Sequence, residues 1–315
     1  MREIVVFSGS SHPALAQEIC RRLGAPLSPS TTKRFTNDCL EVQLEANCRE
    51  RDVFLIQTLS APVQEHLVEL LLMINAARGA SAARITVVMP FYAYARSDKK
   101  DAPRISIGGR LAADLLATAG AGRVLTMALH APQVHGFFSV PVDHLHAHHE
   151  LAAHFRANGD LSNTVVVSPD MGGAKSAAAF ARRLGVPVAV GAKQRLSDTK
   201  VAISAIIGET AGKDVIVLDD EIAAGSTVIE VLEHLRARGV GQVRIACTHG
   251  LFGRGAAQRL ADQPEVVEIV TMNTVPIGPD KRVAKLTELS VAPAFAEAMR
   301  RIHEGESVSE LFEEG

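Results

Sequence analysis

The sequence predicts an α/β fold made of two similar domains, each a mainly parallel β-sheet flanked by helices. Short apolar runs rich in β-branched residues alternate with amphipathic segments of helical length, the pattern of parallel strands joined by crossover helices. Residues 5–26 and 165–187 also parallel each other, because each runs from a strand through Ser and a turn into a helix ending in Arg-Arg-Leu-Gly. At 315 residues the chain is longer than one typical core, which favours two domains.

Each expected strand is a short apolar run that is followed by a turn or a polar segment. In chain order the expected strands cover residues 4–7, 52–57, 84–90, 123–129, 164–169, 186–192, 214–218 and 243–248. Amphipathic segments lie between several of them and supply the helices. We divide the chain into a first domain over 1–146, a second over 147–290, and a tail over 291–315 that forms an amphipathic helix and a short acidic one.

Further matches between the halves support this division. Residues 122–131 align with residues 241–250 without a gap, which places His130 opposite His249. The expected strands that begin near residues 84 and 214 occupy comparable positions between the matched segments. Repeated supersecondary units of this kind indicate two copies of one domain. We therefore expect a cleft between the copies to hold the ligands.

Composition and charge argue against several classes of function. The net charge of −2 gives no general attraction for nucleic acid or an anionic membrane, and the absence of Trp argues against base-stacking platforms. No apolar run is long enough to span a bilayer, and the first ten residues lack a signal-peptide pattern. The four cysteines form no Cys-x-x-Cys pair, so neither a zinc site nor a disulfide framework is indicated. We expect a cytosolic protein.

A group of histidines lies where the two halves join. Its members are His144, His146, His148 and His149. Such a group could hold a metal ion, but the carboxylate–histidine spacing of a typical site is missing. A solvated segment between the domains is the favoured interpretation.

Residues 214–235 combine a strand, two carboxylates and a loop of small residues. Val215–Leu218 is a continuous apolar run, and Asp219 and Asp220 follow it at the strand's carboxyl end, the edge where open α/β sheets bind ligands. The loop Ala223–Thr227 precedes an amphipathic helix that Ser226 or Thr227 can cap. Free amides at a helix start bind phosphate and carboxylates accept from sugar hydroxyls, which together suit a sugar phosphate. An ordinary strand–turn–helix with a solvated acidic turn remains an equal alternative.

This stretch and several others resemble the ribose-phosphate pyrophosphokinase family, the synthetases of 5-phosphoribosyl 1-pyrophosphate (PRPP). The most similar segments are "RFTNDCLEVQLEANCRERDVFLIQTLSAP", "PFYAYARSDKK", "LTMALHAPQVHGFFSVPVDHL", "VVSPDMGG" and "DVIVLDDEIAAGST". The resemblance extends over essentially the whole chain. It implies two tandem phosphoribosyltransferase-type domains, and transfer of the β,γ-pyrophosphoryl group of ATP, with Mg²⁺, to the anomeric hydroxyl of ribose 5-phosphate.

The resemblance also implies roles for individual residues. For ribose 5-phosphate binding these are Asp219, Asp220, Ala223, Ala224, Gly225, Ser226 and Thr227. For ATP binding they are Asn37, Asp38, Cys39, Arg96 and Ser97. His130 and Asp170 match the positions near the metal and the triphosphate. Lys193 and Arg195 match the basic pair of a mobile catalytic loop, and His130 is grouped with them in catalysis.

These residue types suit the implied reaction. Pyrophosphoryl transfer builds negative charge on nonbridging oxygens, so the protein contributes mainly positioning and cations such as Lys193 and Arg195. The guanidinium of Arg96 can pair with phosphate oxygens through two hydrogen bonds. On composition alone, the segments that carry these cations are equally typical of solvated turns and surface loops. The loop of Asn37, Asp38 and Cys39 matches one that reaches into a neighbouring subunit's ATP site, which implies a homo-oligomer, either a dimer or a hexamer.

The sequence departs from the family's usual motifs at three places. Ala223 replaces the first residue of Asp-Thr-Gly-Gly-Thr, Ala128 replaces the Asp of Asp-Leu-His, and "TNDC" over residues 36–39 replaces Ser-Asp-Gly-Glu. We interpret the chain as a divergent synthetase, since the cations remain while carboxylates are fewer. A regulatory paralogue with weakened turnover and a pyrophosphokinase with altered sugar or nucleotide preference remain alternatives. A phosphoribosyltransferase that consumes PRPP ranks last, because one domain would then suffice.

Overall fold

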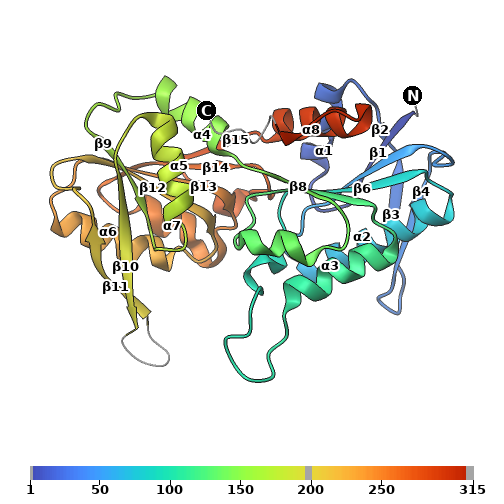
Figure 1. Cartoon of the computed structure of the whole chain (residues 1–315), viewed down its shortest axis with the longest axis horizontal. Coiled ribbons are helices and arrows are strands. Elements are labelled where there is room, and N and C mark those ends of the chain that lie inside the picture. The colour runs from blue at the N-terminus through green and yellow to red at the C-terminus, as the bar shows by residue number, and fades with distance from the viewer. Residues whose placement is uncertain (1–2, 196–200, 310–315) are drawn as a thin grey trace. The chain divides into compact units, whose positions relative to one another are not determined.

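The computed structural model describes residues 3–195 and 201–309, which form two compact units (Figure 1). The first unit extends to His146 and takes in residues 274–276 and the described residues from Ser290 onward. The second unit contains Ala147–Asn273 and Ile277–Leu289 within the same limits. No helix in the described part of the chain is both long and apolar enough to cross a membrane.

The first unit, over its described residues, is built around a six-stranded sheet in which neighbouring strands are parallel. In spatial order the strands are β2 (Leu27–Ser28), β1 (Ile4–Ser8), β5 (Asp52–Ile56), β6 (Arg84–Met89), β7 (Arg123–Met127) and β8 (Val142–Leu145). A separate antiparallel hairpin consists of β3 (Ser30–Arg34) and β4 (Leu40–Leu44). Every residue of β5 is buried, as expected for a strand inside a parallel sheet covered on both faces.

Helices cover the sheet of the first unit on both sides. They are α1 (Pro13–Leu23), α2 (Val63–Gly79), α3 (Gly108–Ala119) and α8 (Ala292–Glu304), with short 3₁₀ turns η1 (Ala93–Arg96) and η2 (Pro132–Phe137). Helix α1 contacts α8 on one side, and α2 contacts α3 on the other (Figure 1). The sequence sets the ends of α1: Pro13 starts it, and Gly24 ends it with a φ of 71° that glycine adopts without strain.

The second unit, in its described residues, contains a seven-stranded sheet. In spatial order its strands are β11 (Val201–Ile207), β10 (Val188–Arg195), β9 (Thr164–Ser168), β12 (Asp214–Ile222), β13 (Val243–Gly250), β14 (Val266–Met272) and β15 (Leu286–Leu289). All pairs are parallel except the hairpin of β10 and β11. Its helices are α4 (His148–Ala157), α5 (Ala174–Leu184), α6 (Ser226–Ala237) and α7 (Ala256–Ala261), with η3 (Gly253–Gly255) and η4 (Pro279–Lys281). Residues of α6 and α7 share a buried core with those of β9, β12 and β13.

The two units have the same strand order, which confirms the repeat but corrects part of its alignment. In both, the first strand pairs in parallel with the next strand along the chain, as β1 does with β2 after α1 and β9 with β10 after α5. The order β2-β1-β5-β6-β7-β8 then matches β10-β9-β12-β13-β14-β15. Strand β13 therefore corresponds to β6 and not to β7, so the predicted equivalence of His130 and His249 is wrong. Buried strands of a parallel sheet have similar sequence patterns. Their positions in the sheet are therefore known only from the strands to which they are hydrogen-bonded.

The end of the chain agrees with the expected helical tail as far as the structure describes it. Helix α8 buries one face that includes Phe295, Met299 and Ile302 and ends at Gly305, whose φ is 77°. It packs on α1 within the first unit. The expected short acidic helix lies mostly outside the described residues.

Candidate active site

The acidic pair lies inside a strand that is longer than predicted. Strand β12 continues through Asp219 and Asp220 to Ile222, and it pairs there with β13. The neighbouring strand β9 ends at Ser168, and Asp170 lies two residues beyond it. The amide of Asp220 donates to Oδ1 of Asp219 at 2.9 Å, and the amide of Gly173 donates to Oδ1 of Asp170 at 3.1 Å. The fold thus gathers three predicted site carboxylates at one edge of the sheet.

The electrostatic environment of Asp219 is unfavourable for a negative charge. Burial at the sheet edge raises the pKa of the Asp219 carboxyl well above its usual range, and the charges of Asp220 and Asp170 add to this effect. Crowded carboxylates of this kind favour either a bound proton or a bound cation. A strongly shifted acid at the ligand-binding edge of an α/β sheet is a typical feature of a functional site.

The loop after β12 makes a sharp turn into α6. Gly225 is the N-cap residue with a φ of 74°, and no side chain caps the helix, so the predicted capping by Ser226 or Thr227 is wrong. A Cβ on Gly225 would lie 3.3 Å from Cβ of Ala256, which leaves little room for a side chain. Gly225 is buried, but Ser226 is exposed and Ala223, Ala224 and Thr227 are half-buried, so a ligand can reach the helix start. Without a side-chain cap, the first amides of α6 are available to an anion.

Residues from the next connection hold this loop in place. The amide of Gly253 donates to the Ala223 carbonyl at 2.8 Å, and the amide of Phe252 donates to the Ile222 carbonyl at 3.0 Å. The guanidinium of Arg259, on α7, donates to the Ala224 carbonyl. These bonds engage the carbonyl side of the loop. The amide side at the start of α6 remains for a ligand. The sequence analysis did not predict these hydrogen bonds. In the sequence, only the glycine-rich segment after β13 could have indicated them.

In the first unit, Arg96 and Ser97 follow β6 at the carboxyl edge of the sheet. Arg96 ends η1 and is exposed. The Ser97 hydroxyl accepts a hydrogen bond from the Gly108 amide at 2.9 Å, and the Ser97 carbonyl accepts from the Gly109 amide at 2.9 Å. Ser97 therefore helps to fix the start of α3 in addition to any contact with a ligand.

His130 follows the neighbouring strand β7 at the same edge. The chain turns sharply there because Ala128 has a φ of 44°, a left-handed conformation that is unusual for a residue other than glycine. Leu129 is buried and His130 is exposed. Since β6 and β7 are adjacent and parallel, Arg96 and His130 both follow carboxyl ends of neighbouring strands.

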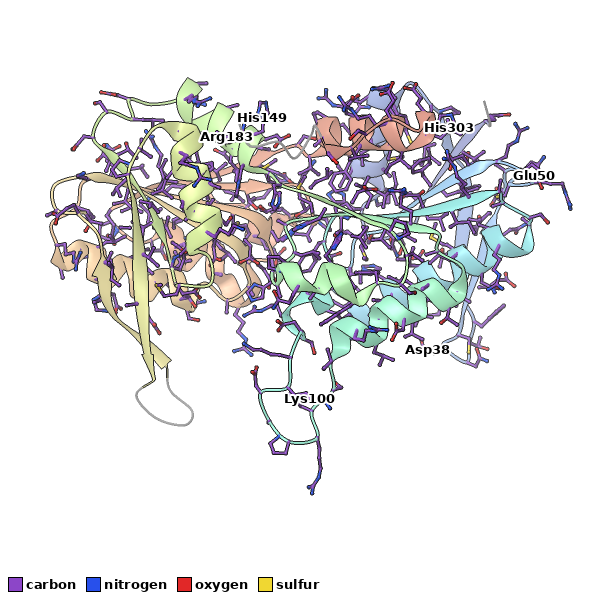
Figure 2. All side chains as sticks on the ribbon, in the orientation of Figure 1. Asp38, Glu50, Lys100, His149, Arg183 and His303 are labelled. Carbon is purple, nitrogen blue, oxygen red and sulfur yellow. The ribbon has the colours of Figure 1, made fainter. Side chains whose placement is uncertain are left out.

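The predicted ATP-binding loop of residues 37–39 lies on the hairpin and not at that edge. Asn37, Asp38 and Cys39 form the turn between β3 and β4, where Asp38 has a φ of 70° and the Cys39 amide donates to Oδ1 of Asn37 at 3.3 Å. Figure 2 shows Asp38 well apart from the segment after Arg96 that carries Lys100. The hairpin turn at Asp38 and the segment at Lys100 therefore lie apart within one chain.

The predicted catalytic cations lie on a hairpin of the second unit. The backbone of Lys193 and Arg195 belongs to β10, which pairs antiparallel with β11, so both residues extend a strand and not a loop as expected. Residues 196–200, which follow them and belong to the predicted catalytic loop, are outside the described part of the chain. This hairpin begins beside β9, the strand that leads to Asp170.

The histidine group is divided by the structure. Nε2 of His148 lies 3.0 Å from the Ser176 hydroxyl, and the His144 and His146 rings are 4.6 Å apart. His144 also accepts a hydrogen bond from the Leu129 amide at 2.8 Å, so the interpretation of a merely solvated segment is wrong for this residue. Among the described residues there is no group of three or more His, Cys, Asp or Glu side chains arranged to hold a metal ion.

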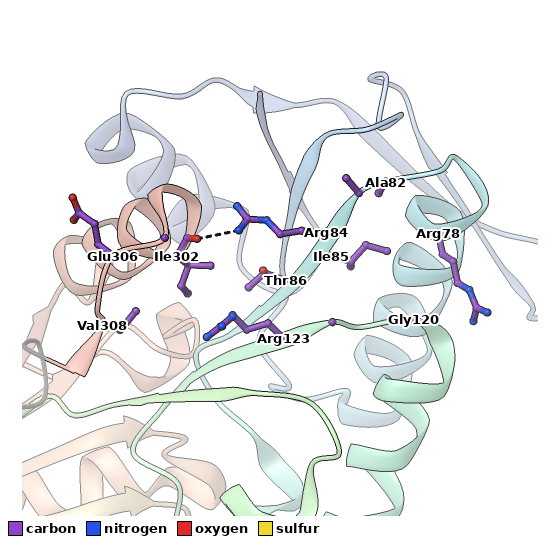
Figure 3. Close-up of a pocket in the computed structure, with 13 residues that line it drawn as sticks. Arg78, Ala82, Arg84, Ile85, Thr86, Gly120, Arg123, Ile302, Glu306 and Val308 are labelled. Carbon is purple, nitrogen blue, oxygen red and sulfur yellow. Dashed lines mark hydrogen bonds between the residues drawn. The ribbon is translucent and has the colours of Figure 1, made fainter. Parts of the chain in front are cut away.

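A separate pocket of about 530 Å³ lies in the first unit at the amino ends of β6 and β7 (Figure 3). Arg78, Arg84 and Arg123 contribute to its lining, together with residues after α8. Arg84 pairs with Asp52 and Arg123 pairs with Asp143, so two of these cations are already neutralised. No predicted site residue lines this pocket, which is at the opposite edge of the sheet from His130.

Known proteins match this arrangement over the whole chain. The family described as the N-terminal domain of ribose phosphate pyrophosphokinase matches residues 4–120, and the family described as the phosphoribosyl synthetase-associated domain matches residues 193–313. A protein of Streptomyces coelicolor named putative ribose-phosphate pyrophosphokinase is 70% identical over 99% of this chain and 98% of its own length. The chain belongs to the ribose-phosphate pyrophosphokinase family.

Other relatives of this family agree with the assignment. A ribose-phosphate pyrophosphokinase of Deinococcus radiodurans is 51% identical, with 98% of each chain covered. The crystal structure of phosphoribosylpyrophosphate synthetase from Mycobacterium smegmatis matches with a TM-score of 0.91 at 39% identity, covering 96% of this chain and 100% of that one. The predicted family is confirmed, and so is the predicted fold of two phosphoribosyltransferase-type α/β domains.

Proposed function

We propose that this chain transfers the β,γ-pyrophosphoryl group of ATP to the anomeric hydroxyl of ribose 5-phosphate, giving PRPP and AMP. The anomeric oxygen forms a bond to the β-phosphorus, and the bond from that phosphorus to the α,β-bridging oxygen breaks. AMP leaves with the bridging oxygen, and the hydroxyl proton is released. The observation that carries the proposal is the β12–α6 segment, which places two carboxylates and an amide-lined helix start side by side on the family's scaffold.

Ribose 5-phosphate fits the two ends of this segment. The amides at the start of α6 and the positive end of the helix suit the 5-phosphate, with Ala223, Ala224, Gly225, Ser226 and Thr227 supplying the loop. Asp219 and Asp220 suit the ribose hydroxyls, which donate hydrogen bonds to carboxylate oxygens. The amide bonds from Phe252 and Gly253 favour this binding mode because they hold the loop before the sugar arrives.

The donor set fits Mg²⁺. Asp170, Asp219 and Asp220 crowd one sheet edge, and the raised pKa of Asp219 shows that negative charge there is poorly compensated. A preformed protein cage is not needed, because Mg²⁺ is commonly held by one or two carboxylates together with substrate phosphates and water. We assign this role to Asp170, and to His130 on the triphosphate side. When bound, Mg²⁺ neutralises developing charge on the phosphate oxygens.

Cations of the chain suit the ATP side. Arg96 and Ser97, at the carboxyl edge of the first sheet, are assigned to ATP contacts together with His130. Lys193 and Arg195 are assigned to the charge that builds on the nonbridging oxygens during transfer. Their place on β10, beside the strand that leads to Asp170, supports this assignment.

We assign adenine recognition to Asn37, Asp38 and Cys39 of a second subunit. The separation of Asp38 from Lys100, in the segment after Arg96, supports a homo-oligomer, either a dimer or a hexamer. Exposed apolar side chains of the first unit, including Phe35, Leu111 and Leu115, are suited to contacts between subunits. The four cysteines are free, which supports a place in the reducing cytosol.

The alternatives from the sequence are less favoured. Relatives that are 51% and 44% identical over nearly the whole chain are named as ribose-phosphate pyrophosphokinases, which argues against a regulatory paralogue that has lost turnover. The alanines at positions 128 and 223 remain the reason to compare several nucleotides and sugars in the assay.

The test is release of AMP from ATP and ribose 5-phosphate in the presence of Mg²⁺. We expect AMP and PRPP in equal amounts, and a fall of about a hundredfold or more in Lys193→Ala. Lys213→Ala, at the amino end of β12, is the matched control and should retain full activity. No AMP above the Lys193→Ala background with any of several nucleotides would reject the proposed reaction. Substrate binding by calorimetry without turnover would instead favour a regulatory protein.

A further inference from the structure

A strained residue precedes His130 by two positions. Ala128 has a φ of 44°, and it lies where β7 ends and the chain turns towards the exposed His130. Residues other than glycine keep such a conformation only where the surrounding structure holds it. The question is which groups hold Ala128, because they also set the direction in which His130 leaves the strand.

Two hydrogen bonds to acceptors on β8 flank the strained residue. The Ala128 amide donates to the Leu145 carbonyl at 2.9 Å, which continues the ladder between β7 and β8. The next amide, that of Leu129, donates to Nε2 of His144 at 2.8 Å. The two peptide groups on either side of Ala128 are therefore fixed to adjacent residues of β8. The second bond depends on a side chain.

The geometry fixes the state of the His144 ring. A backbone amide can only donate, so Nε2 of His144 is the unprotonated nitrogen that accepts. The ring is half-buried and stands beside the ring of His146, with centroids 4.6 Å apart. His144 itself lies opposite Thr126 in the parallel pairing of β7 and β8, which places its side chain next to the end of β7. The neighbouring strand and ring thus hold the acceptor in position.

We propose that His144 is a positioning residue for His130: its Nε2 holds the Leu129 amide, stabilises the left-handed turn at Ala128, and so keeps His130 at the triphosphate position. The inference rests on the proposed function, since His130 acts there on ATP and the metal. Leu129 is buried, so a shift of its peptide group is resisted on one side by packing and on the other by His144.

The first test compares two substitutions of His144. His144→Phe keeps a ring beside His146 but has no acceptor, whereas His144→Gln places a carbonyl oxygen at a similar distance from Cα as Nε2. We expect kcat to fall roughly tenfold in His144→Phe, as for a lost hydrogen bond that orders a catalytic group, and to be largely retained in His144→Gln. KM for ribose 5-phosphate should not change. Equal loss in both variants, or wild-type kcat in a folded His144→Phe, would overturn the proposal.

A double-mutant cycle separates positioning from a general structural effect. If His144 acts through His130, then His144→Phe should have no further effect on kcat once His130 is replaced by Ala. Additive losses in the double variant would overturn the proposal. Wild-type activity in His130→Ala would also overturn it and would remove His130 from the site, but the proposed reaction would stand.

Hydrogen exchange gives a readout that does not need turnover. The Leu129 amide of the full chain should exchange slowly in the wild type and in His144→Gln, and at least roughly tenfold faster in His144→Phe. Fast exchange of this amide in the wild type would overturn the proposal without any variant. Absence of PRPP formation by the wild type would reject the proposed function. Slow exchange of the Leu129 amide that depends on His144 would even then support the role of His144 in stabilising the turn at Ala128.

Discussion

The carboxylate of Asp52, fully buried at the first residue of β5, accepts a hydrogen bond from Nδ1 of His303 at 2.8 Å. Asp52 also pairs with Arg84, whose guanidinium donates to the backbone carbonyls of Ile302 at 3.4 Å and His303 at 3.1 Å (Figure 3). One buried carboxylate thus connects the end of α8 to the amino ends of β5 and β6. Both the His303 ring and the Arg84 guanidinium lose this acceptor if the carboxylate is removed.

We expect Asp52→Ala to lower the free energy of unfolding by roughly 2–3 kcal/mol, because it removes the buried acceptor that the His303 ring and the Arg84 guanidinium share. The partial exposure of Arg84 keeps the effect below that of a fully buried pair. Urea unfolding measures it. Glu3→Gln, which removes an exposed ion pair with Arg51, is the control and should change stability by less than about 0.5 kcal/mol. Equal stability of the two variants would contradict a structural role for the network.

Replacing Asp219 by a neutral residue is expected to stabilise the protein, by an amount that depends on pH. Burial, with the charges of Asp220 and Asp170, raises the pKa of the Asp219 carboxyl in the folded state, so folding favours the protonated form. Its contribution to stability is therefore fully present below the unfolded value of about 3.9 and is lost as pH rises through the raised pKa. Near pH 4, Asp219→Asn should have the same stability as the wild type. At pH 8 it should be more stable and unfold at a higher urea concentration than the wild type. Its kcat/KM should fall by roughly a hundredfold.

Asp160 is the control of opposite sign. The Ser162 amide and hydroxyl both donate to its carboxylate at 2.9 Å and lower its pKa. Its contribution to stability is present above the unfolded value and is lost as pH falls through the lowered one. Asp160→Asn should therefore be less stable than the wild type at pH 8, with activity unchanged. A shift in the same direction for both variants would contradict the pKa assignments.

Much of the second unit's site was predictable because the chemistry is local. The apolar run before Asp219, the small residues from 223 to 227 and the amphipathic helix after them are contiguous, and periodicity alone indicates a strand, a turn and a helix. The turn's detail was not predictable: Gly225 caps the helix with a left-handed backbone, and Asp219 lies inside the strand because β13 extends its pairing.

Long-range contacts explain what sequence reasoning missed. The bond from the Leu129 amide to His144 joins residues on neighbouring strands, and nothing in the pattern of a histidine-rich segment indicates it. The error in the alignment of the two halves has the same cause. Strands β7 and β13 have similar local sequence patterns but occupy different places in their sheets. Lys193 was expected on a loop because it matches the basic pair of the family's mobile catalytic loop and follows an apolar strand in a polar segment. Pairing with β11 extends the strand through them.

The left-handed Gly225 predicts a combined effect on stability and substrate binding. Gly225→Ala adds a Cβ at a φ of 74° and 3.3 Å from Cβ of Ala256, so we expect a loss of about 1 kcal/mol in stability and a severalfold higher KM for ribose 5-phosphate. Gly185→Ala is the matched control, with a φ of 75° and no atom within 4 Å of the added Cβ. It should lose similar stability but keep its KM. Unchanged KM in Gly225→Ala would separate this loop from sugar-phosphate binding.

The position of the β3–β4 hairpin predicts complementation between subunits. If each site takes Lys193 from its own chain and the hairpin turn from a neighbour, a dimer of Lys193→Ala with an Asn37→Ala/Asp38→Ala/Cys39→Ala variant contains one site with both defects and one with none. Random mixing then yields half mixed dimers, each with one intact site, so an equal mixture of the two inactive proteins should regain about a quarter of wild-type activity. The measurement is AMP release after co-refolding or subunit exchange, with each variant alone as control. If the hairpin turn instead serves its own chain, every site carries a defect and mixing restores nothing, a result that would contradict the assignment of Asn37, Asp38 and Cys39 to a neighbouring subunit's ATP site.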